Sequence, residues 1–336
     1  MRVCLAWLLL LAGTVCAAPA PTMPLELSGL SMGTTWHVKL VSPPFASAAV
    51  LRSGIQSTLD RIDGQMSTYK PDSDLARFNA APAETWQTLP SEFFDVLQRA
   101  LRLARDSDGA YDPTVGALVD LWGFGPVQRP HEPPTKAAIR AARRHVGWWR
   151  LKLDPPRQRA WQPGGVHLDL SSIAKGYAVD EVARWLEHHG VAAYLVEIGG
   201  ELRAGGRKPD GSDWFVVIEA SSDDAPGDDA PTLALRDAAV ATSGDYRRFF
   251  THDGNTFSHH IDPRNGLPVS HRVASVTVVA RHAVDADPLG TLLSVLGPEK
   301  GMDYALRHGL AVLMRVHGID GVEEHRSPAF DALMSH

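Results

Sequence analysis

The 336-residue sequence predicts one folded unit that combines helices and strands in an α+β arrangement. Segments with the 3.6-residue apolar period of amphipathic helices are interspersed with short alternating or continuous apolar runs, which are typical of strands. A hydrophobic content of 44% suits a large core, and no stretch of linker composition separates independent domains. The net charge of -6 gives no electrostatic basis for nucleic-acid binding, which excludes that class of function.

Residues 1–17 are predicted to be a cleaved signal peptide rather than part of the fold. Arg2 supplies the positive charge, and Leu5 to Val15 form an apolar run too short to span a bilayer comfortably. Cleavage after Ala17 leaves residues 18–336 as the folded unit. Both cysteines, Cys4 and Cys16, lie in the signal, and the residues before Cys16 make a poor lipidation site. We therefore expect a periplasmic protein without thiols, disulfides or a stable membrane anchor.

The first folded segments read as a strand followed by two helices. Apolar and polar residues alternate from Leu25 to Val41, which predicts a strand. Helices are expected over 46–66 and 93–108, each with apolar residues on one face. The proline-containing stretch 66–74 between them is expected to be a loop. Tyr69 on this loop can either stack on a flat ligand ring or pin the loop to the core.

Residues 107–165 give weaker signals. Glycine and proline over 109–114 predict a turn that leads into an apolar segment over 115–122. A helix is expected near 135–145. The adjacent Trp148 and Trp149 are expected to be core residues.

The segment from Leu168 to Gly190 organises the rest of the chain. It reads as a short strand, a corner and a long helix, which Ser171 or Ser172 can cap. Asp169, the serine hydroxyls and Lys175 lie at the helix start beside free backbone N–H groups, which favour anions. This set suits a phosphorylated ligand and its metal. A well-capped surface helix with a solvated lysine is the alternative.

The chain then becomes mainly β. Strands are expected over 192–198 and 214–220, and residues 221–231 read as an acidic surface loop. Gly199-Gly200 lacks the glycine spacing of a dinucleotide-binding fingerprint, and no Walker A motif is present. The commonest nucleotide-binding folds are therefore excluded.

Two later stretches carry groups suited to chemistry. His259 and His260 titrate near neutral pH and precede a turn over 262–266, whose charged residues can be purely structural. Asp287 and Thr291 stand four residues apart, so their oxygens share one face of a helix. With a backbone carbonyl they make a hard oxygen site suited to Mg²⁺. Helix capping is the alternative for this pair.

The sequence DLSSIAKGYAVDEVA, residues 169–183, resembles the central motif of the ApbE family, the flavin transferases that move FMN from FAD onto a protein threonine. Other stretches match the family in the right chain order: MGTTWHV (32–38), MSTYKPDSDLARFN (66–79), SDGAYDPTVGALVDLWGFGP (107–126), SGDYRRFF with SHHIDPRNGLPV (243–250 and 258–269), and ADPLGTLLSVLG (286–297). The resemblance implies a two-lobed α+β fold, related to the T-fold, with FAD in the cleft between interlocked lobes.

The resemblance also implies the reaction and its residues. FMN would pass from FAD to a threonine of an exported or membrane-bound redox protein, AMP would leave, and Mg²⁺ would be required. His259 would accept the threonine proton. FAD would be held around Met32, Tyr69, Ala110, Tyr111, Asp112, Asp169, Lys175 and Ile261, and the metal by Ser172, Asp287 and Thr291.

Two departures from the family pattern leave alternatives open. His260 stands at a usually apolar position and Asn265 replaces a customary threonine, so either His259 or His260 is a candidate for the proton acceptor. A hydrolase that releases FMN and AMP would use the same residues. A non-catalytic FAD-binding accessory protein of a respiratory complex is a further alternative.

Overall fold

The computed structural model describes residues 24–41, 47–127, 129–218, 232–244, 249–319 and 321–334. The predicted signal peptide, both cysteines, the acidic stretch 221–231 and residues 245–248 of the SGDYRRFF motif lie outside these ranges. In the described part of the chain, no helix is both long enough and apolar enough to cross a membrane.

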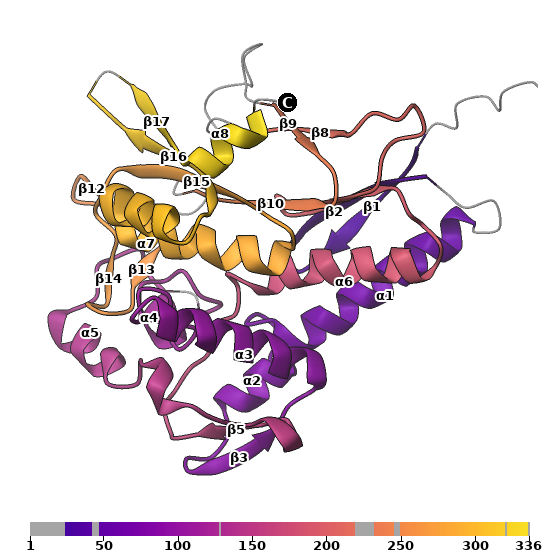
Figure 1. Ribbon diagram of the computed structural model, residues 1–336. Coiled ribbons are helices and arrows are strands. Elements are labelled where there is room, and N and C mark those ends of the chain that lie inside the picture. Colours follow the sequence, from indigo (N-terminus) through magenta and orange to yellow (C-terminus); the bar gives the residue numbers. More distant parts are fainter. Residues whose placement is uncertain are drawn as a thin grey trace, which may run out of the picture.

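An eight-stranded antiparallel sheet is the main structural element (Figure 1). Its strand order is β1-β2-β6-β7-β10-β15-β16-β17. The strands are β1 Leu25–Ser31, β2 Thr34–Leu40, β6 Tyr194–Ile198, β7 Glu201–Gly205, β10 Ala238–Gly244, β15 Val273–Ala280, β16 Ala311–His317 and β17 Val322–Arg326.

Both faces of this sheet are covered. Helices α1 (Ala48–Met66), α6 (Ala174–His188) and α7 (Ala283–Arg307) pack on one face, and α7 is interrupted at Gly297, where φ is 80°. Helix α8 (Pro328–Met334) and the hairpin of β8 (Trp214–Val217) and β9 (Thr232–Leu235) pack on the other.

Successive side chains of a strand point to opposite faces of the sheet, so each strand contributes to the cores on both sides. In β10, Ala239 and Ala241 belong to the core beneath the helices, whereas Val240 belongs to the cluster with Trp214 and Phe330.

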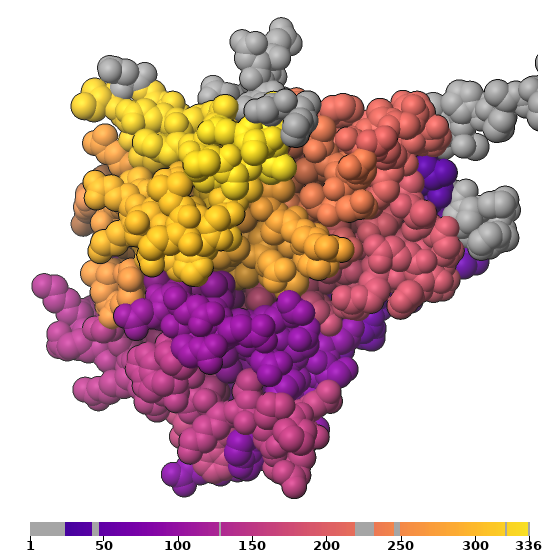
Figure 2. All heavy atoms as spheres, in the orientation of Figure 1, coloured from indigo at the N-terminus to yellow at the C-terminus, as the bar shows by residue number. Residues whose placement is uncertain are grey.

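A second lobe lies below the helical layer in Figures 1 and 2. It contains α2 (Asp74–Asn79), α3 (Ser91–Asp106), α4 (Gly116–Leu121), α5 (Lys136–Arg143), the short helices η1 (Trp148–Arg150) and η2 (Pro155–Arg157), and a sheet of β3 (Thr85–Thr88), β5 (Arg159–Gln162) and β4 (Lys152–Asp154). Two small hairpins, β11 (Phe249–His252) with β12 (Asn255–Ser258) and β13 (Ile261–Asp262) with β14 (Leu267–Pro268), complete the described elements. Along the described chain, the first two strands of the large sheet precede the second lobe, and the remaining strands of that sheet follow it. The predicted α+β class is confirmed.

The predicted helices at 46–66, 93–108 and 135–145 are confirmed with small shifts of their ends, but the strand predicted over 25–41 is wrong. This segment is a β1–β2 hairpin whose two-residue turn is Met32-Gly33, with φ of 51° and 73°. Positive φ at both turn positions matches the twist of the paired strands. Methionine is an uncommon residue at such a position, and the alternation of apolar residues continues across the turn.

Trp149 and the cap of α6 also differ from expectation. Trp149 is 66% exposed rather than a core residue, whereas Trp148 is half-buried against the core. Helix α6 begins after Ile173 without any side-chain cap, so neither Ser171 nor Ser172 caps it. The predicted end of this helix is confirmed by Gly190, whose φ is 78°.

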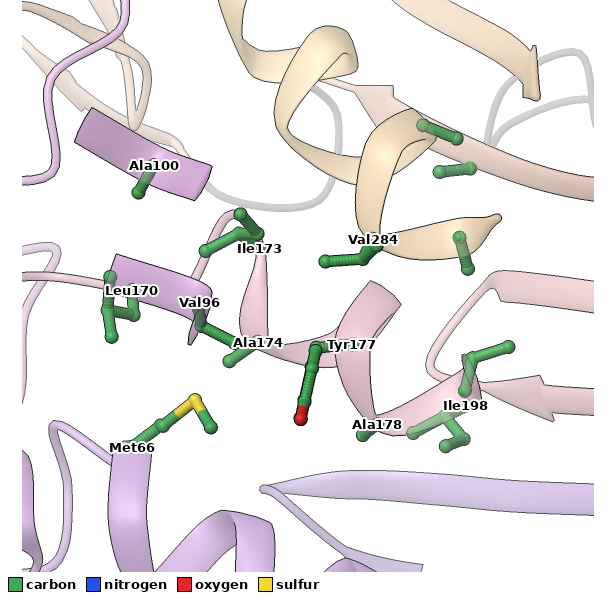
Figure 3. Close-up of a cluster of buried hydrophobic side chains, with 14 of the residues drawn as sticks. Met66, Val96, Ala100, Leu170, Ile173, Ala174, Tyr177, Ala178, Ile198 and Val284 are labelled. Atoms are coloured by element: carbon green, nitrogen blue, oxygen red, sulfur yellow. The ribbon is translucent and has the colours of Figure 1, made fainter. Parts of the chain in front are cut away.

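The start of α6 is buried between several elements. Figure 3 shows Ala174 and Tyr177 of α6 near Met66 of α1, Val96 of α3 and Val284 of α7. A tertiary contact takes the place of the missing local cap, because the Gly176 N–H donates to Oδ2 of Asp287 in α7 at 2.8 Å.

The reverse contact is also present. Asp180 of α6 accepts hydrogen bonds from the amides of Ala283 and Val284, at 3.1 and 2.9 Å, at the start of α7. A carboxylate near a helix N-terminus satisfies free N–H groups and interacts favourably with the helix dipole. Helices α6 and α7 therefore cap each other.

Candidate active site

A cavity of about 350 Å³ opens at one end of the large sheet, beside the second lobe. The β1–β2 turn at Met32-Gly33, the β6–β7 turn at Gly199 and the last residues of β10 form one side. The starts of α6 and α7, the turn over 110–112, the segment over 259–263, the loop at Thr68 and Tyr69, and residues between 115 and 125 also line it. Segments from both lobes thus meet around one space.

The structure brings all twelve expected site residues to the wall of this cavity. Their roles remain predictions, but none of them lies elsewhere in the fold. They are Met32, Tyr69, Ala110, Tyr111, Asp112, Asp169, Ser172, Lys175, His259, Ile261, Asp287 and Thr291.

The turn over 110–114 is held by Asp112. Its Oδ1 accepts the amide and hydroxyl of Thr114, at 2.9 and 2.7 Å, and its Oδ2 accepts the amide of Trp148 at 2.8 Å. Burial raises the pKa of Asp112, and these hydrogen bonds oppose the rise. These three hydrogen bonds fix the turn at the cavity wall.

The corner before α6 is fixed in a similar way. The amide of Ser171 donates to Oδ1 of Asp169 at 2.8 Å, and the hydroxyl of Ser172 donates to the phenol oxygen of Tyr111 at 3.1 Å. Burial raises the pKa of Tyr111 well above its usual value, so the phenol stays neutral.

A cluster of charged groups, of which the two acids are buried, lies near the start of α6. Lys175 Nζ lies 2.6 Å from Oε1 of Glu201, the first residue of β7. Burial raises the pKa of Glu201 to about 8, the charge of Asp287 contributes to the rise, and Lys175 opposes it. Burial also raises the pKa of Asp287, against the effects of Lys175 and the Gly176 amide.

Sequence reasoning missed Glu201. An acid directly after the Gly199-Gly200 bend was the available signal, but its approach to Lys175 depends on the tertiary fold.

The proposed metal ligands suit a hard divalent cation. Asp287 offers a buried carboxylate, Thr291 a hydroxyl one helical turn later, and Ser172 a carbonyl at the same cavity. Among the described residues, no three histidine, cysteine or acidic side chains lie close enough together to hold a metal ion. The expected ligand set therefore has a single charged side chain, Asp287. Asp285, the other acid at the start of α7, is exposed and pairs with Arg99 at 3.5 Å and His282 at 3.7 Å instead.

The two histidines differ in environment. His259 is half-buried at the cavity wall, with its ring 4.1 Å from that of His260 and edge-on to Phe124 at 6.3 Å. His260 is only 6% exposed. Burial, followed by the charges of His259 and His271, holds the pKa of His260 well below its usual value. His259 is therefore the better placed of the two to exchange a proton with a ligand.

Tyr69 is not a core residue, because its side chain is 57% exposed at the cavity mouth. Buried Ser73 holds the loop, with its hydroxyl donating to the Ser67 carbonyl at 2.7 Å and accepting the Ala76 amide at 2.9 Å. The stacking role of Tyr69 stays a prediction.

Comparisons with known proteins agree with this architecture. The chain is 41% identical to a FAD:protein FMN transferase of Vibrio cholerae over 99% of this chain and 98% of that protein, and 38% identical to one of Haemophilus influenzae over 96% and 95%. The crystal structure of Pseudomonas stutzeri flavinyl transferase ApbE in its apo form matches with a TM-score of 0.86 and 41% identity, over 93% of this chain and 97% of that one. The flavin transferase ApbE from Vibrio cholerae matches with a TM-score of 0.85 and 39% identity, over 93% and 100%. The ApbE family model matches residues 32–314, and the chain belongs to the ApbE family.

Proposed function

We propose that this protein is a Mg²⁺-dependent FAD:protein FMN transferase that esterifies a threonine hydroxyl of an acceptor protein. The observation that supports this most is the meeting of Lys175, Asp287 and His259, from three distant segments, at one cavity. The names of the curated relatives support the same reaction. A lysine, an acid with hard oxygen neighbours and a histidine are the groups that phosphoryl transfer to a hydroxyl requires.

FAD would bind with its pyrophosphate near the start of α6, where the helix dipole favours an anion. Lys175 adds a positive charge at this point. Tyr69 at the cavity mouth offers a ring for stacking on the isoalloxazine or adenine ring. These contacts would bring the phosphorus atom on the FMN side near His259.

In the reaction, the threonine Oγ forms a bond to the FMN phosphorus while the bond from that phosphorus to the AMP oxygen breaks. His259 accepts the threonine proton, and AMP leaves with the electron pair of the broken bond. Lys175 stabilises the negative charge on the phosphoryl oxygens. His260 stays neutral and packs against His259, which keeps that ring at the cavity wall.

Ser172, Asp287 and Thr291 would hold the metal. When bound, Mg²⁺ supplies charge stabilisation to the pyrophosphate. Asp287 is fixed for this task, because its Oδ2 is held by the Gly176 amide while Oδ1 remains for the metal.

We also propose that the protein is exported, which would place it with exported or membrane-bound redox acceptors. The predicted signal over residues 1–17 supports this. Protein recovered from the periplasm should have the intact mass of a chain that begins at Ala18. An uncleaved chain or a lipid on Cys16 would contradict export as a free protein.

The function can be tested with purified protein, FAD, Mg²⁺ and an exported redox protein that carries an acidic-start threonine motif. The acceptor should gain the mass of FMN less water, and AMP should appear in equal amount. Free FMN without acceptor labelling would identify a hydrolase instead, and no FAD cleavage at all would identify a binding protein.

The variant Asp287→Asn tests the metal role within this assay. The amide oxygen can still accept the Gly176 N–H, but the negative charge is lost. Charge stabilisation by a metal is worth several kcal/mol, so the transfer rate should fall by at least about 100-fold, with partial rescue by high Mg²⁺. Asp285→Asn, on the exposed side of the same helix, is the matched control and should keep full activity. Equal activity of the two variants would refute the assignment of Asp287.

A further inference from the structure

Glu201 carries a buried oxygen that the fold does not use. The residue is 3% exposed and lies at the cavity wall. Its Oε1 pairs with Lys175 at 2.6 Å, whereas Oε2 is buried and has no hydrogen-bond partner among the described residues. A buried carboxylate oxygen without a partner is costly, so native proteins rarely leave one unless a ligand or water completes it.

The charges around Glu201 favour a cation as that ligand. Glu201 and Asp287 provide two carboxylates at the same cavity, and Lys175 provides one ammonium group. A cation at Oε2 would stabilise the ionised form of both buried acids, whereas a neutral hydroxyl would only satisfy the hydrogen-bonding capacity of Oε2. The pyrophosphate of FAD would add more negative charge beside it, which a buried site cannot hold without a compensating cation.

The backbone fixes Glu201 in this position. It follows the tight β6–β7 turn, in which Gly199 and Gly200 have φ of 59° and 102°. The Gly200 amide donates to Oε1 of Glu197 at 2.7 Å, and the Gly199 amide donates to the Thr35 carbonyl of the neighbouring strand at 3.1 Å. The turn therefore holds the carboxylate of Glu201 at the cavity, and its approach to Lys175 is not an accident of a loosely held loop.

We propose that Glu201 is a further residue of the divalent-cation site, in which Oε1 positions Lys175 and Oε2 binds the hydrated cation. The inference rests on the proposed Mg²⁺-dependent function and adds a second carboxylate to the expected set of Ser172, Asp287 and Thr291. Glu201 thereby links the metal to the lysine that faces the phosphate. Residues beside a metal site influence its metal affinity because they orient the ligands and form hydrogen bonds with them.

The test uses Mn²⁺ as the probe, with the full mature protein and without FAD or acceptor. Free Mn²⁺ is measured by its electron paramagnetic resonance signal, and Mg²⁺ should displace the bound ion. Glu201→Gln keeps the shape of the side chain but removes its charge, and it should raise the Kd for Mn²⁺ about 10–100-fold. Glu197→Gln is the matched control on the same turn, because its amide oxygen can still accept the Gly200 N–H. Its Kd should equal that of the unchanged protein.

A second variant protects the test against a folding defect in Glu201→Gln. Lys175→Met removes the positive charge that competes with the cation, so it should bind Mn²⁺ more tightly than the unchanged protein. A merely structural role for the Lys175–Glu201 pair predicts looser or equal binding in this variant. Unchanged Mn²⁺ affinity in Glu201→Gln, equal loss in both glutamate variants, or no tightening in Lys175→Met would overturn the inference.

These results separate the inference from the proposed function. If the protein transfers FMN but Glu201→Gln binds Mn²⁺ normally, only the role of Glu201 is refuted. If Mn²⁺ binding depends on Glu201 but no FMN reaches an acceptor, only the transferase proposal is refuted.

Discussion

Replacing Gly176 by alanine tests the close contact between α6 and α7. A Cβ at this position would overlap the carbonyl oxygen of Ala283 and lie 2.8 Å from the Cβ of Asp287. Both neighbours belong to the first turns of α7 and cannot move without moving that helix. The Gly176 amide would also be displaced from Oδ2 of Asp287, which it meets at 2.8 Å.

The opposing effects on stability can be compared directly. Alanine is a better helix former than glycine by about 1 kcal/mol. Overpacking costs about 1–3 kcal/mol, and a lost hydrogen bond to a charged group costs about 1.5–3 kcal/mol. The Gly176→Ala variant should therefore lose about 1.5–5 kcal/mol of unfolding free energy.

Urea denaturation followed by circular dichroism measures this difference. Gly64→Ala is the matched control, because Gly64 also lies in a helix but a Cβ added there would meet no neighbouring atom within 4 Å. That variant should gain up to about 1 kcal/mol. If Gly176→Ala is as stable as Gly64→Ala, the interpretation of the α6–α7 contact is wrong.

Two further predictions concern the cavity wall. Burial lowers the pKa of the His260 imidazole in the folded state. Neutral His260 therefore contributes fully to the free energy of unfolding above about pH 6.5, the pKa of histidine in the unfolded chain. This contribution is lost as the pH falls through the lowered pKa of the folded state. Between pH 7.5 and 5 the melting temperature of His260→Ile should therefore fall less than that of the unchanged protein or of His37→Gln, an exposed control, and parallel curves would contradict this. Tyr69→Ala should weaken FAD binding about two- to tenfold, since stacking is worth about 0.5–1.5 kcal/mol, while the melting temperature stays the same because Tyr69 is exposed. An unchanged Kd in a fluorescence titration would show that Tyr69 does not contact FAD.

Local sequence patterns predicted the elements whose side chains have a clear period. The helices at 46–66 and 93–108 have apolar residues on one face, and the structure places them within a few residues of the expected ends. The β1–β2 hairpin was missed because methionine is uncommon at the first turn position, where Met32 adopts positive φ, and Gly33 alone is a weak turn signal. At Met32, the pairing of β1 with β2 determines the backbone conformation, rather than the local preference of methionine.

The candidate site could be predicted only in part, because its residues come from distant parts of the sequence. Gly176 and Asp287, for example, are 111 residues apart, and no local sequence pattern pairs them. That the site residues lie together was expected only from the resemblance to the ApbE family. The serine cap of α6 was a sound local expectation, but a tertiary carboxylate replaced it. Glu201 was missed because its partner Lys175 lies across a helix–strand contact.

The mutual capping of α6 and α7 has a consequence for the ion selectivity of the proposed metal site. Because the Gly176 amide holds one oxygen of Asp287, the side chain is already fixed, and binding an ion through the other oxygen would not require its rotation to be frozen. A rigid oxygen favours an ion that demands regular octahedral coordination at short distance. Ca²⁺ instead prefers adaptable ligands at longer range. If Asp287 binds the metal as proposed, the geometry that joins the two helices would favour Mg²⁺ over Ca²⁺ before any flavin is bound.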